Sequence, residues 1–262
     1  MDNHAYPNAK DLLKLFLVLL LFMVGFGMLM GIYQVIPGVI ITSSIQSLLN
    51  LIGYTLSLSA TIWYAFQKSK KQHPDSFRLD VNRFPLWLIP VLIVCTLAMT
   101  VGMERLSSLI PMPDKVARFF EDLFKTDLYS IIMIAVAAPV LEETLCRGIV
   151  LKGLLQNYSP RQAIIYSSIF FALIHMNPWQ SIPAFFAALF IGWIYYKTKS
   201  VIPGMIIHFV NNSTAVALTF LAKGEQDYLS WLGMPAYIVL CIAAAIVFAG
   251  SCMLIQRKIK HE

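Results

Sequence analysis

The sequence predicts an all-α membrane protein, a polytopic bundle of about eight transmembrane helices that forms one membrane-embedded domain over residues 1–262. Apolar residues make up 58% of the 262 residues and charged residues 13%. In ordinary soluble domains, apolar residues make up about 45–50% of the chain and charged residues about 25%. The apolar residues, which give a mean hydropathy of +0.69, are spread along the whole chain. These observations exclude a soluble globular protein.

The predicted spans follow from the lengths of the apolar runs, because a helix needs about 20 residues to cross a hydrocarbon core about 30 Å thick. The first run follows Lys10 and Lys14 and is too long for the apolar region of a signal peptide, so we expect an uncleaved first span. Polar or Pro/Gly clusters separate eight runs: 12–36, 43–67, 86–103, 128–150, 162–178, 180–196, 201–222 and 235–256.

The distribution of basic residues predicts the orientation, because cytoplasmic loops retain Lys and Arg. Eight spans place both termini on one side of the membrane. With both termini cytoplasmic, 14 of the 20 Lys and Arg residues fall in inner segments, 5 fall in outer segments, and Arg147 lies within a span. This bias and the short loops fit a bacterial plasma membrane, and they leave an endoplasmic reticulum membrane open.

Two further features of the sequence restrict its partners. The formal net charge is +6, but the basic residues punctuate apolar stretches and form no basic face, so no nucleic-acid partner is expected. The segment 114–127 has apolar residues at helical spacing opposite charged ones. It predicts an amphipathic helix that lies on the membrane lipids or packs over the mouth of the bundle. The cysteines lie in apolar runs without C-x-x-C spacing, which argues against a disulfide framework and a thiolate zinc site.

Ionisable and amide side chains inside the predicted spans cluster in the second half of the chain. A charged group near the bilayer centre costs a few kcal/mol or more, so such residues are candidates for a functional site. The motifs that carry chemistry fall within 139–212, whereas the helices over 12–103 are less specific. The candidates are Glu142, Glu143 and Arg147 in span four, His175 at the end of span five, and His208, Asn211 and Asn212 in span seven.

In span four, Glu143 and Arg147 are four residues apart and can form an ion pair on one helical face. Glu142 then has no partner in its own helix. A carboxylate in a low-dielectric site without a cation binds a proton more readily than one in water, as a general base must. Pro139 is expected to kink the helix just before the pair. The alternative is that the span ends near Val140 and both glutamates lie at the solvated interface.

Taken singly, neither histidine indicates a catalytic function. His175 lies near a span end, where it can be an interior residue with its hydrogen bonds made within the protein or a hydrogen-bond donor at the membrane–water interface. His208 and Asn212 share a helical face and can hydrogen-bond a neighbouring helix, which is worth about 1 kcal/mol. At about 1.5 Å per residue, Glu142 and Asn212 fall near mid-membrane, whereas His175 falls towards the outer face.

Taken in order, these motifs resemble the CAAX-protease and bacteriocin-processing family of intramembrane glutamate endopeptidases. The resemblance covers the segment from Glu142 to Asn212 and is specific only for the three motifs jointly. The first motif is matched by Glu142, Glu143 and Arg147, the second by Phe171 and His175, and the third by His208 and Asn212.

The resemblance implies peptide hydrolysis without a metal or other cofactor, on a peptide or membrane-tethered protein substrate. Glu142 would be the general base, and His175 would help to hold the water. Glu143 and Arg147 would brace the site, and His208 and Asn212 would donate hydrogen bonds to the developing oxyanion. Some members of the family cut after prenylated cysteines and others process peptide toxins or confer resistance to them.

Other functions stay open at this point. A metal enzyme can use His175, His208 and a glutamate, although H-E-x-x-H is missing and Arg147 would repel a cation. A transporter can use the same residues as a proton relay. A non-catalytic scaffold, such as a bacteriocin-immunity or envelope-regulation protein, can keep the fold without the activity. Cys146 lies on the face of Glu142, and we expect it to be a small apolar residue and not a nucleophile.

Overall fold

The computed structural model describes residues 5–72, 78–108, 110–116, 127–221 and 228–259. Regular secondary structure in these ranges is helical, and the one β-type pairing there is an isolated bridge between Val81 and Ser200. The chain divides into two compact units, Met1–Leu79 with Pro113–Phe170 and Asp80–Met112 with Phe171–Glu262. Each unit is described by itself. That residues 1–262 form one membrane-embedded domain stays a prediction.

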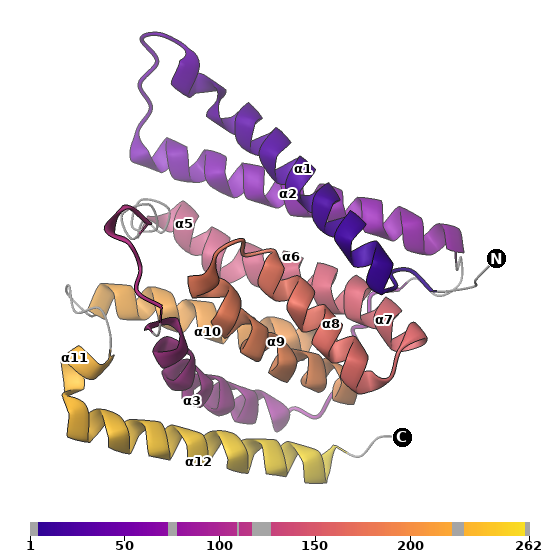
Figure 1. The fold of residues 1–262 in the computed structure, drawn as a ribbon, viewed down its shortest axis with the longest axis vertical. Coiled ribbons are helices and arrows are strands. Elements are labelled where there is room, and N and C mark those ends of the chain that lie inside the picture. The colour runs from indigo at the N-terminus through magenta and orange to yellow at the C-terminus, as the bar shows by residue number, and fades with distance from the viewer. Residues whose placement is uncertain (1–4, 73–77, 109, 117–126, 222–227, 260–262) are drawn as a thin grey trace. The chain divides into compact units, whose positions relative to one another are not determined.

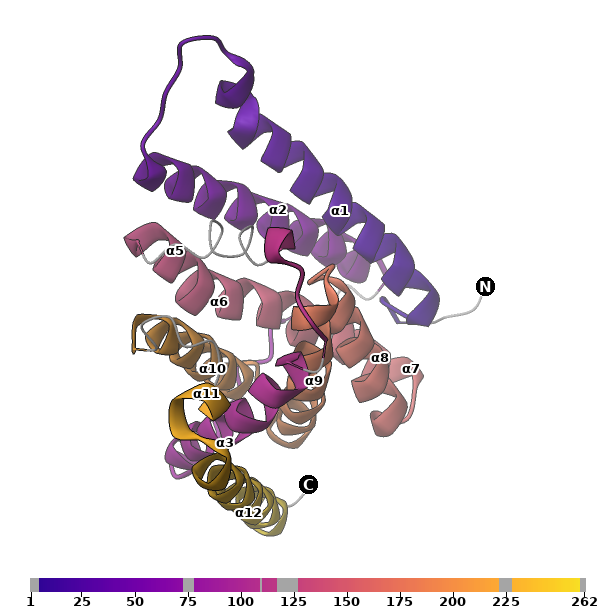
Figure 2. The same cartoon turned by 60° about the vertical axis from the view of Figure 1, so that its left-hand side comes forward.

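The first unit consists of a long helical hairpin and the helical run that carries the glutamates. Helices α1 (Ala9–Gly31) and α2 (Ser43–Gln72) lie side by side, and α2 also packs along the segment from α5 (Leu128–Ile132) to α6 (Ala138–Glu143) (Figures 1 and 2). A single 3₁₀ turn, η1 (Ile32–Val35), follows α1. The run continues through α7 (Lys152–Asn157), and most of α8 (Pro160–Leu173) follows in the same unit.

The N-terminus of the first unit is fastened to the end of the glutamate-bearing run. Asn8 caps α1 by accepting hydrogen bonds from backbone N–H groups of the first turn, and Asp11 completes a capping box. The Asn157 side chain bonds both the N–H and the carbonyl of Ala5, at 3.0 and 2.7 Å. The Tyr158 hydroxyl accepts from the N–H of Ala9 at 3.1 Å. These bonds tie the start of α1 to the end of α7.

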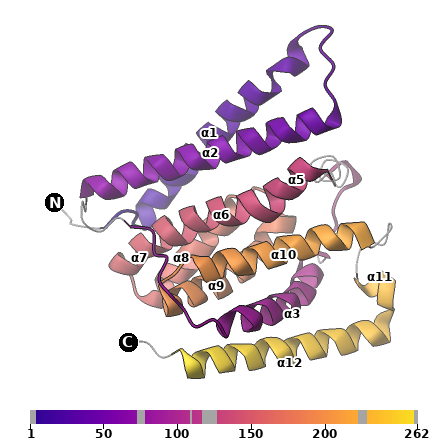
Figure 3. The same ribbon diagram turned by 180° about the vertical axis from the view of Figure 1, so that it is seen from behind.

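The second unit is organised around α3. Its helices are α3 (Leu88–Ser108), α9 (Pro178–Thr198), α10 (Ile202–Leu221), the short α11 (Tyr228–Leu232) and α12 (Met234–Lys258). Helix α3 contacts α9, α10 and α12 (Figure 3). Its apolar face supplies Leu88, Leu92 and Cys95 to a buried core that also contains Ile194 from α9 and Ile207 from α10. This packing fixes α10, which carries three of the candidate residues, His208, Asn211 and Asn212.

The start of α10 is further fixed by the segment that precedes α3. The Val201 N–H donates to the carbonyl of Asp80 at 2.8 Å, and the Tyr195 hydroxyl donates to the Asp80 carboxylate at 2.6 Å. The Asn82 amide donates to the carbonyl of Lys199, which has a left-handed φ of 47° and ends α9. The turn between α9 and α10 is therefore held by the segment that precedes α3.

Five helical segments among the described residues are long and apolar enough to cross a membrane: Ala9–Val35, Ser43–Lys71, Leu88–Leu106, Leu128–Asn157 and Met234–Lys258. They correspond to the first four predicted spans and the eighth. Helices α8, α9 and α10 lie where spans five to seven are predicted. Large apolar side chains such as Leu21 in α1 and Ile246 in α12 are exposed, as expected of helices that face lipid. The predicted amphipathic helix at 114–127 falls mostly outside the described residues.

Candidate active site

The glutamates lie in a continuous helical run from Leu128 to Asn157 that is not α-helical throughout. Two stretches, η2 (Met133–Ala137) and η3 (Thr144–Leu151), are π-helical, and they flank α6. Pro139 lacks an N–H group, so the carbonyl four residues before it loses its α-helical donor. The preceding turn is wider, and the Ala138 N–H donates to Met133 five residues back. A π-helical stretch therefore precedes Pro139, and the predicted kink itself stays a prediction.

The predicted ion pair between Glu143 and Arg147 is confirmed. A guanidinium nitrogen of Arg147 donates to Glu143 Oε1 at 2.9 Å, and the two residues are 1% and 0% exposed. Two charges this deeply buried stabilise each other, whereas either one alone would be strongly unfavourable. Burial of both side chains also excludes, for Glu143, the alternative of a solvated helix end at Val140.

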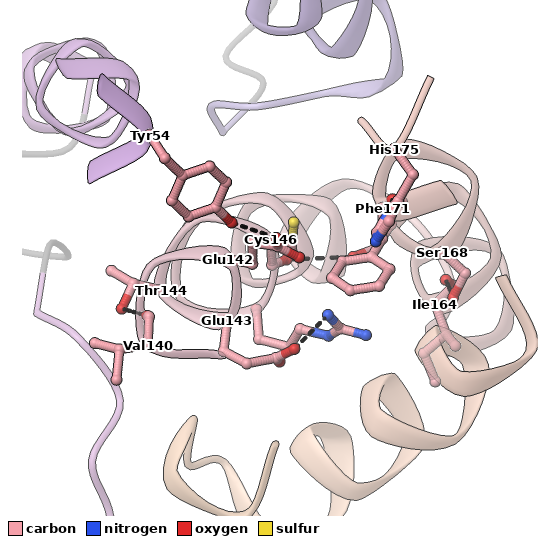
Figure 4. Close-up of polar contacts among 12 residues, drawn as sticks. Tyr54, Val140, Glu142, Glu143, Thr144, Cys146, Ile164, Ser168, Phe171 and His175 are labelled. Atoms are coloured by element: carbon pink, nitrogen blue, oxygen red, sulfur yellow. Dashed lines mark hydrogen bonds and ion pairs between the residues drawn. The ribbon is translucent and has the colours of Figure 1, made fainter. Parts of the chain in front are cut away.

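Glu142 is buried as well, at 9% exposed, but it has a different partner. Its Oε1 accepts a hydrogen bond from the hydroxyl of Tyr54 in α2 at 2.5 Å, and Figure 4 shows the tyrosine ring pointing at this carboxylate. Its Oε2 is buried and has no hydrogen-bond partner among the described residues. The expectation that Glu142 has no partner in its own helix therefore holds, and a neutral group from another helix takes that place.

Cys146 is completely buried, one turn after Glu142 in the same helical run (Figure 4). Its backbone carbonyl accepts a hydrogen bond from the Ser167 hydroxyl of α8 at 3.2 Å. This bond satisfies a carbonyl within the π-helical stretch and fastens α8 to it. The burial fits the apolar role expected for the thiol.

The histidines belong to the second unit, where Phe171 lies between them. Its ring centroid is 5.1 Å from that of His175 and 5.7 Å from that of His208, the second pair edge-to-face. Aromatic pairs at these separations are favourable. Phe171 and His208 are buried, and His175 is half-buried. The structure therefore brings together the second motif and the histidine of the third.

His175 does not lie in a helix, which corrects the predicted span 162–178. Helix α8 ends at Leu173, and His175 follows in a turn. Met176 has a left-handed φ of 55°, and the Asn177 side chain caps α9 before Pro178. An Asn-Pro pair begins a new helix rather than continuing the previous one. The boundary error follows from placing the span end by hydropathy alone.

The turn selects the tautomer of the neutral His175 ring. Its Nδ1 lies 2.8 Å from the carbonyl oxygen of Phe171. A carbonyl can only accept, so Nδ1 carries the hydrogen in this bond. In the neutral imidazole the lone pair is then on Nε2, which can accept a proton or a hydrogen bond from water.

In α10, Asn212 lies one turn after His208, as the spacing predicts. The amide nitrogen of Asn211 donates to Asn212 Oδ1 at 3.1 Å. With its oxygen engaged, Asn212 turns its amide N–H groups elsewhere, as donors. Asn211, which sequence analysis noted but gave no role, therefore influences the orientation of Asn212.

The seven predicted site residues thus form two groups, each brought together within its unit. Glu142, Glu143 and Arg147 lie in the first unit, and Phe171, His175, His208 and Asn212 lie in the second. That Glu142 faces the two imidazoles stays a prediction. Tyr54 was missed, because a tyrosine in an apolar run has no spacing relative to Glu142 that the sequence could reveal. No group of three or more His, Cys, Asp or Glu side chains in the described part of the chain is placed to hold a metal ion.

Comparison with known families identifies the segment that contains these residues. Residues 124–214 match the family model of Rce1-like proteins, described as type II CAAX prenyl endopeptidases. The match contains all seven predicted residues and confirms the resemblance to the CAAX-protease family. Neither a curated protein nor a solved structure matches the chain. The family indicates a protease, and the five apolar helices indicate an integral membrane protein.

Proposed function

We propose that this protein is an intramembrane endopeptidase that hydrolyses a peptide bond with a water activated by Glu142 and His175, without a metal ion. One observation carries the proposal: two adjacent buried glutamates have different partners. Glu143 is paired with Arg147, whereas Glu142 accepts from a neutral hydroxyl and forms no ion pair among the described residues. A carboxylate stabilised by a guanidinium is a poor base, and one without a cation is a better base.

The proposed first step is attack of water on the scissile carbonyl. Glu142 Oε2, buried and without a hydrogen-bond partner among the described residues, accepts a proton from the water. His175 Nε2, which bears the ring lone pair, accepts a hydrogen bond from the same water and orients it. The water oxygen then bonds to the carbonyl carbon, and the carbonyl oxygen becomes negatively charged.

His208 and Asn212 are the proposed donors to that oxygen. The support is the orientation of the Asn212 amide, whose oxygen is already bonded to Asn211. In a water-poor site, one such donor contributes about 100- to 1,000-fold to kcat. The tetrahedral intermediate then collapses as the C–N bond breaks, and Glu142 returns its proton to the leaving amine. Glu143 and Arg147 touch no reacting atom in this scheme and hold the helix in position.

The family description suggests the first substrate to test. A peptide that ends in a prenylated cysteine and three further residues would enter the site from the membrane lipids, where the prenyl chain partitions. We further propose that α8, α9 and α10 complete a bundle of eight transmembrane helices. Both termini would be cytoplasmic, and the host membrane would be a bacterial plasma membrane. Other peptide or membrane-tethered protein substrates are tested with the same assay.

The decisive experiment compares Glu142→Gln with the wild type on an internally quenched, farnesylated peptide in proteoliposomes. We expect kcat to fall about 100- to 10,000-fold, with unchanged membrane insertion and thermal unfolding. Glu104→Gln is the matched control, because Glu104 in α3 also accepts from a tyrosine hydroxyl, that of Tyr237 at 3.3 Å. It should keep wild-type activity.

Four results would contradict the proposal. Equal cleavage by the wild type and Glu142→Gln would show that Glu142 is not the base. Loss of activity in Cys146→Ser would indicate a thiol nucleophile, and loss of activity in a strong chelator would indicate a metal enzyme. A wild type that cleaves neither the farnesylated peptide nor its unprenylated form, nor any peptide of the host membrane proteome, would favour the scaffold role.

A further inference from the structure

We propose that Tyr54, which lies outside the family segment 124–214, is a positioning residue of the active site. Its hydroxyl holds Glu142 by Oε1 and so selects Oε2 as the oxygen that takes the proton from water. The inference rests on the proposed function. It adds that the N-terminal hairpin α1–α2, whose sequence contains none of the three motifs, contributes to the site.

The first support is the contact between Tyr54 and Glu142. The Tyr54 hydroxyl and Glu142 Oε1 are 2.5 Å apart, and an ionised carboxylate can only accept, so the phenol donates. Hydrogen bonds from a neutral donor to a carboxylate are short and about twice as strong as bonds between neutral groups. Such a bond restricts the last torsion of the glutamate, which is otherwise the freest one in the side chain.

The second support is the difference between the two oxygens of Glu142. Oε1 is engaged by Tyr54, whereas Oε2 is buried without a hydrogen-bond partner among the described residues. An unsatisfied buried acceptor is costly, and it gains most from a water that donates to it. The hydrogen bond to Oε1 therefore leaves one oxygen, in one orientation, for the proton transfer.

The third support is that Tyr54 itself is held in place. A Cβ on the preceding residue, Gly53, would be only 3.1 Å from the Met30 side chain, so α1 and α2 approach closely there. One turn later, the Ser57 hydroxyl lies within hydrogen-bond distance of the carbonyls of Gly53, at 2.6 Å, and Phe22 in α1, at 3.2 Å. The Tyr54 side chain is thus held on α2, which packs closely against α1.

The chemistry of a phenol suits this task better than that of a cation. Arg147 orients Glu143 equally well, but a guanidinium also stabilises the charged carboxylate and removes its basicity. A neutral hydroxyl supplies direction with a smaller effect on proton affinity. The two adjacent glutamates therefore show both solutions, one for a structural carboxylate and one for a base.

The test varies the donor at position 54 and measures kcat and KM separately on the farnesylated quenched peptide. Tyr54→Phe should lower kcat about 10- to 100-fold, because a reacting group out of place by about 1 Å costs up to about 100-fold. KM should change less than twofold if Tyr54 does not touch the substrate. Para-aminophenylalanine at position 54, introduced by codon suppression, restores a donor and should recover most of kcat, whereas para-methoxyphenylalanine should not.

The matched control is Tyr158→Phe. Tyr158 lies in the same unit, and its hydroxyl accepts a hydrogen bond from the N–H of Ala9. This variant should keep wild-type kcat even if its unfolding temperature falls. If Tyr54→Phe is as unstable as it is inactive, the comparison of the para-amino and para-methoxy variants decides.

The outcomes separate this inference from the proposed function. Wild-type kcat in Tyr54→Phe, with Glu142→Gln inactive, would overturn the role of Tyr54 and leave the protease standing. Equal kcat for the para-amino and para-methoxy variants would show that the hydrogen bond is not the cause. Equal activity of the wild type and Glu142→Gln would instead overturn the proposed function.

Discussion

In the first unit, Glu143 is held by a buried ion pair with Arg147 at 2.9 Å, whereas in the second unit His175 and His208 flank Phe171. The glutamate-bearing run is also fastened at both ends, by Asp127 at its start and by Ala5, Tyr6 and Pro7 at its end. Both imidazoles contact the ring of Phe171, and His175 also bonds the Phe171 carbonyl. The difference predicts that breaking the ion pair of the first unit lowers stability, whereas removing a proposed donor of the second unit lowers activity.

The largest expected effect comes from breaking the ion pair. Arg147→Met leaves Glu143 buried without its guanidinium, and loss of one partner of a buried pair costs about 3–5 kcal/mol. We expect a large fall in the unfolding temperature in detergent. The double variant Glu143→Leu, Arg147→Met removes both charges and should recover most of the loss. A single variant as stable as the wild type would show that the pair does not hold this run.

The next effect should be kinetic and should arise in the second unit. Asn212→Ala removes a proposed oxyanion donor, and we expect kcat on the quenched peptide to fall about 100- to 1,000-fold, with an unfolding temperature near that of the wild type. Thr214→Ala, which removes a hydroxyl bonded to the Val210 carbonyl of the same helix, is the control and should keep its activity. If Asn212→Ala unfolds early and keeps kcat, the contrast between the units is wrong.

Hydropathy and helical spacing predicted much of the fold. The five apolar helices of the structure fall where spans are predicted, because length and composition decide whether a helix can cross a membrane. The four-residue spacing also predicted the Glu143–Arg147 pair, since it depends only on local helical geometry. What hydropathy could not place was the end of α8, where the Asn177 cap and Pro178 decide the boundary.

The parts of the site that sequence could not predict depend on contacts between distant segments. Tyr54 and Glu142 are 88 residues apart, and no local pattern connects them. The place of Phe171 between two imidazoles likewise depends on a contact of its ring with His208 in α10, which no local pattern reveals. The motifs identified which residues carry the chemistry, whereas the partner of each one is a property of the packing.

A smaller effect is expected where the run is fastened at its end. A Cβ at Gly153 would lie 2.5 Å from Pro7 Cδ and from the Tyr6 carbonyl oxygen, closer than any side chain can tolerate. Gly153→Ala must therefore displace the N-terminal segment, and overpacking of this kind costs about 1–3 kcal/mol. Gly25→Ala in α1, where a Cβ would meet nothing within 4 Å, is the control and should be neutral or stabilising. Similar unfolding temperatures for the two variants would mean that the contact between Gly153 and the segment with Tyr6 and Pro7 is not needed for stability.

The smallest effect should be found at the start of the run and should depend on pH. Burial acts to raise the pKa of Asp127, but hydrogen bonds from Ser47, Ser130 and Tyr129 outweigh it and hold the pKa below its ordinary value. Because the folded carboxyl binds protons less readily than the unfolded one, its stabilising contribution is present above about pH 4 and is lost as the pH falls further.

Asp127→Asn keeps an acceptor for the helix start but cannot titrate. We expect the wild type to be more stable by about 0.5 kcal/mol near neutral pH, because a negative charge at a helix N-terminus is favourable, and to lose this advantage when unfolding is followed down to pH 3. A constant difference between the two proteins across this range would show that folding does not lower the pKa of Asp127. It would also remove one of the two fastenings that set the first unit apart from the second.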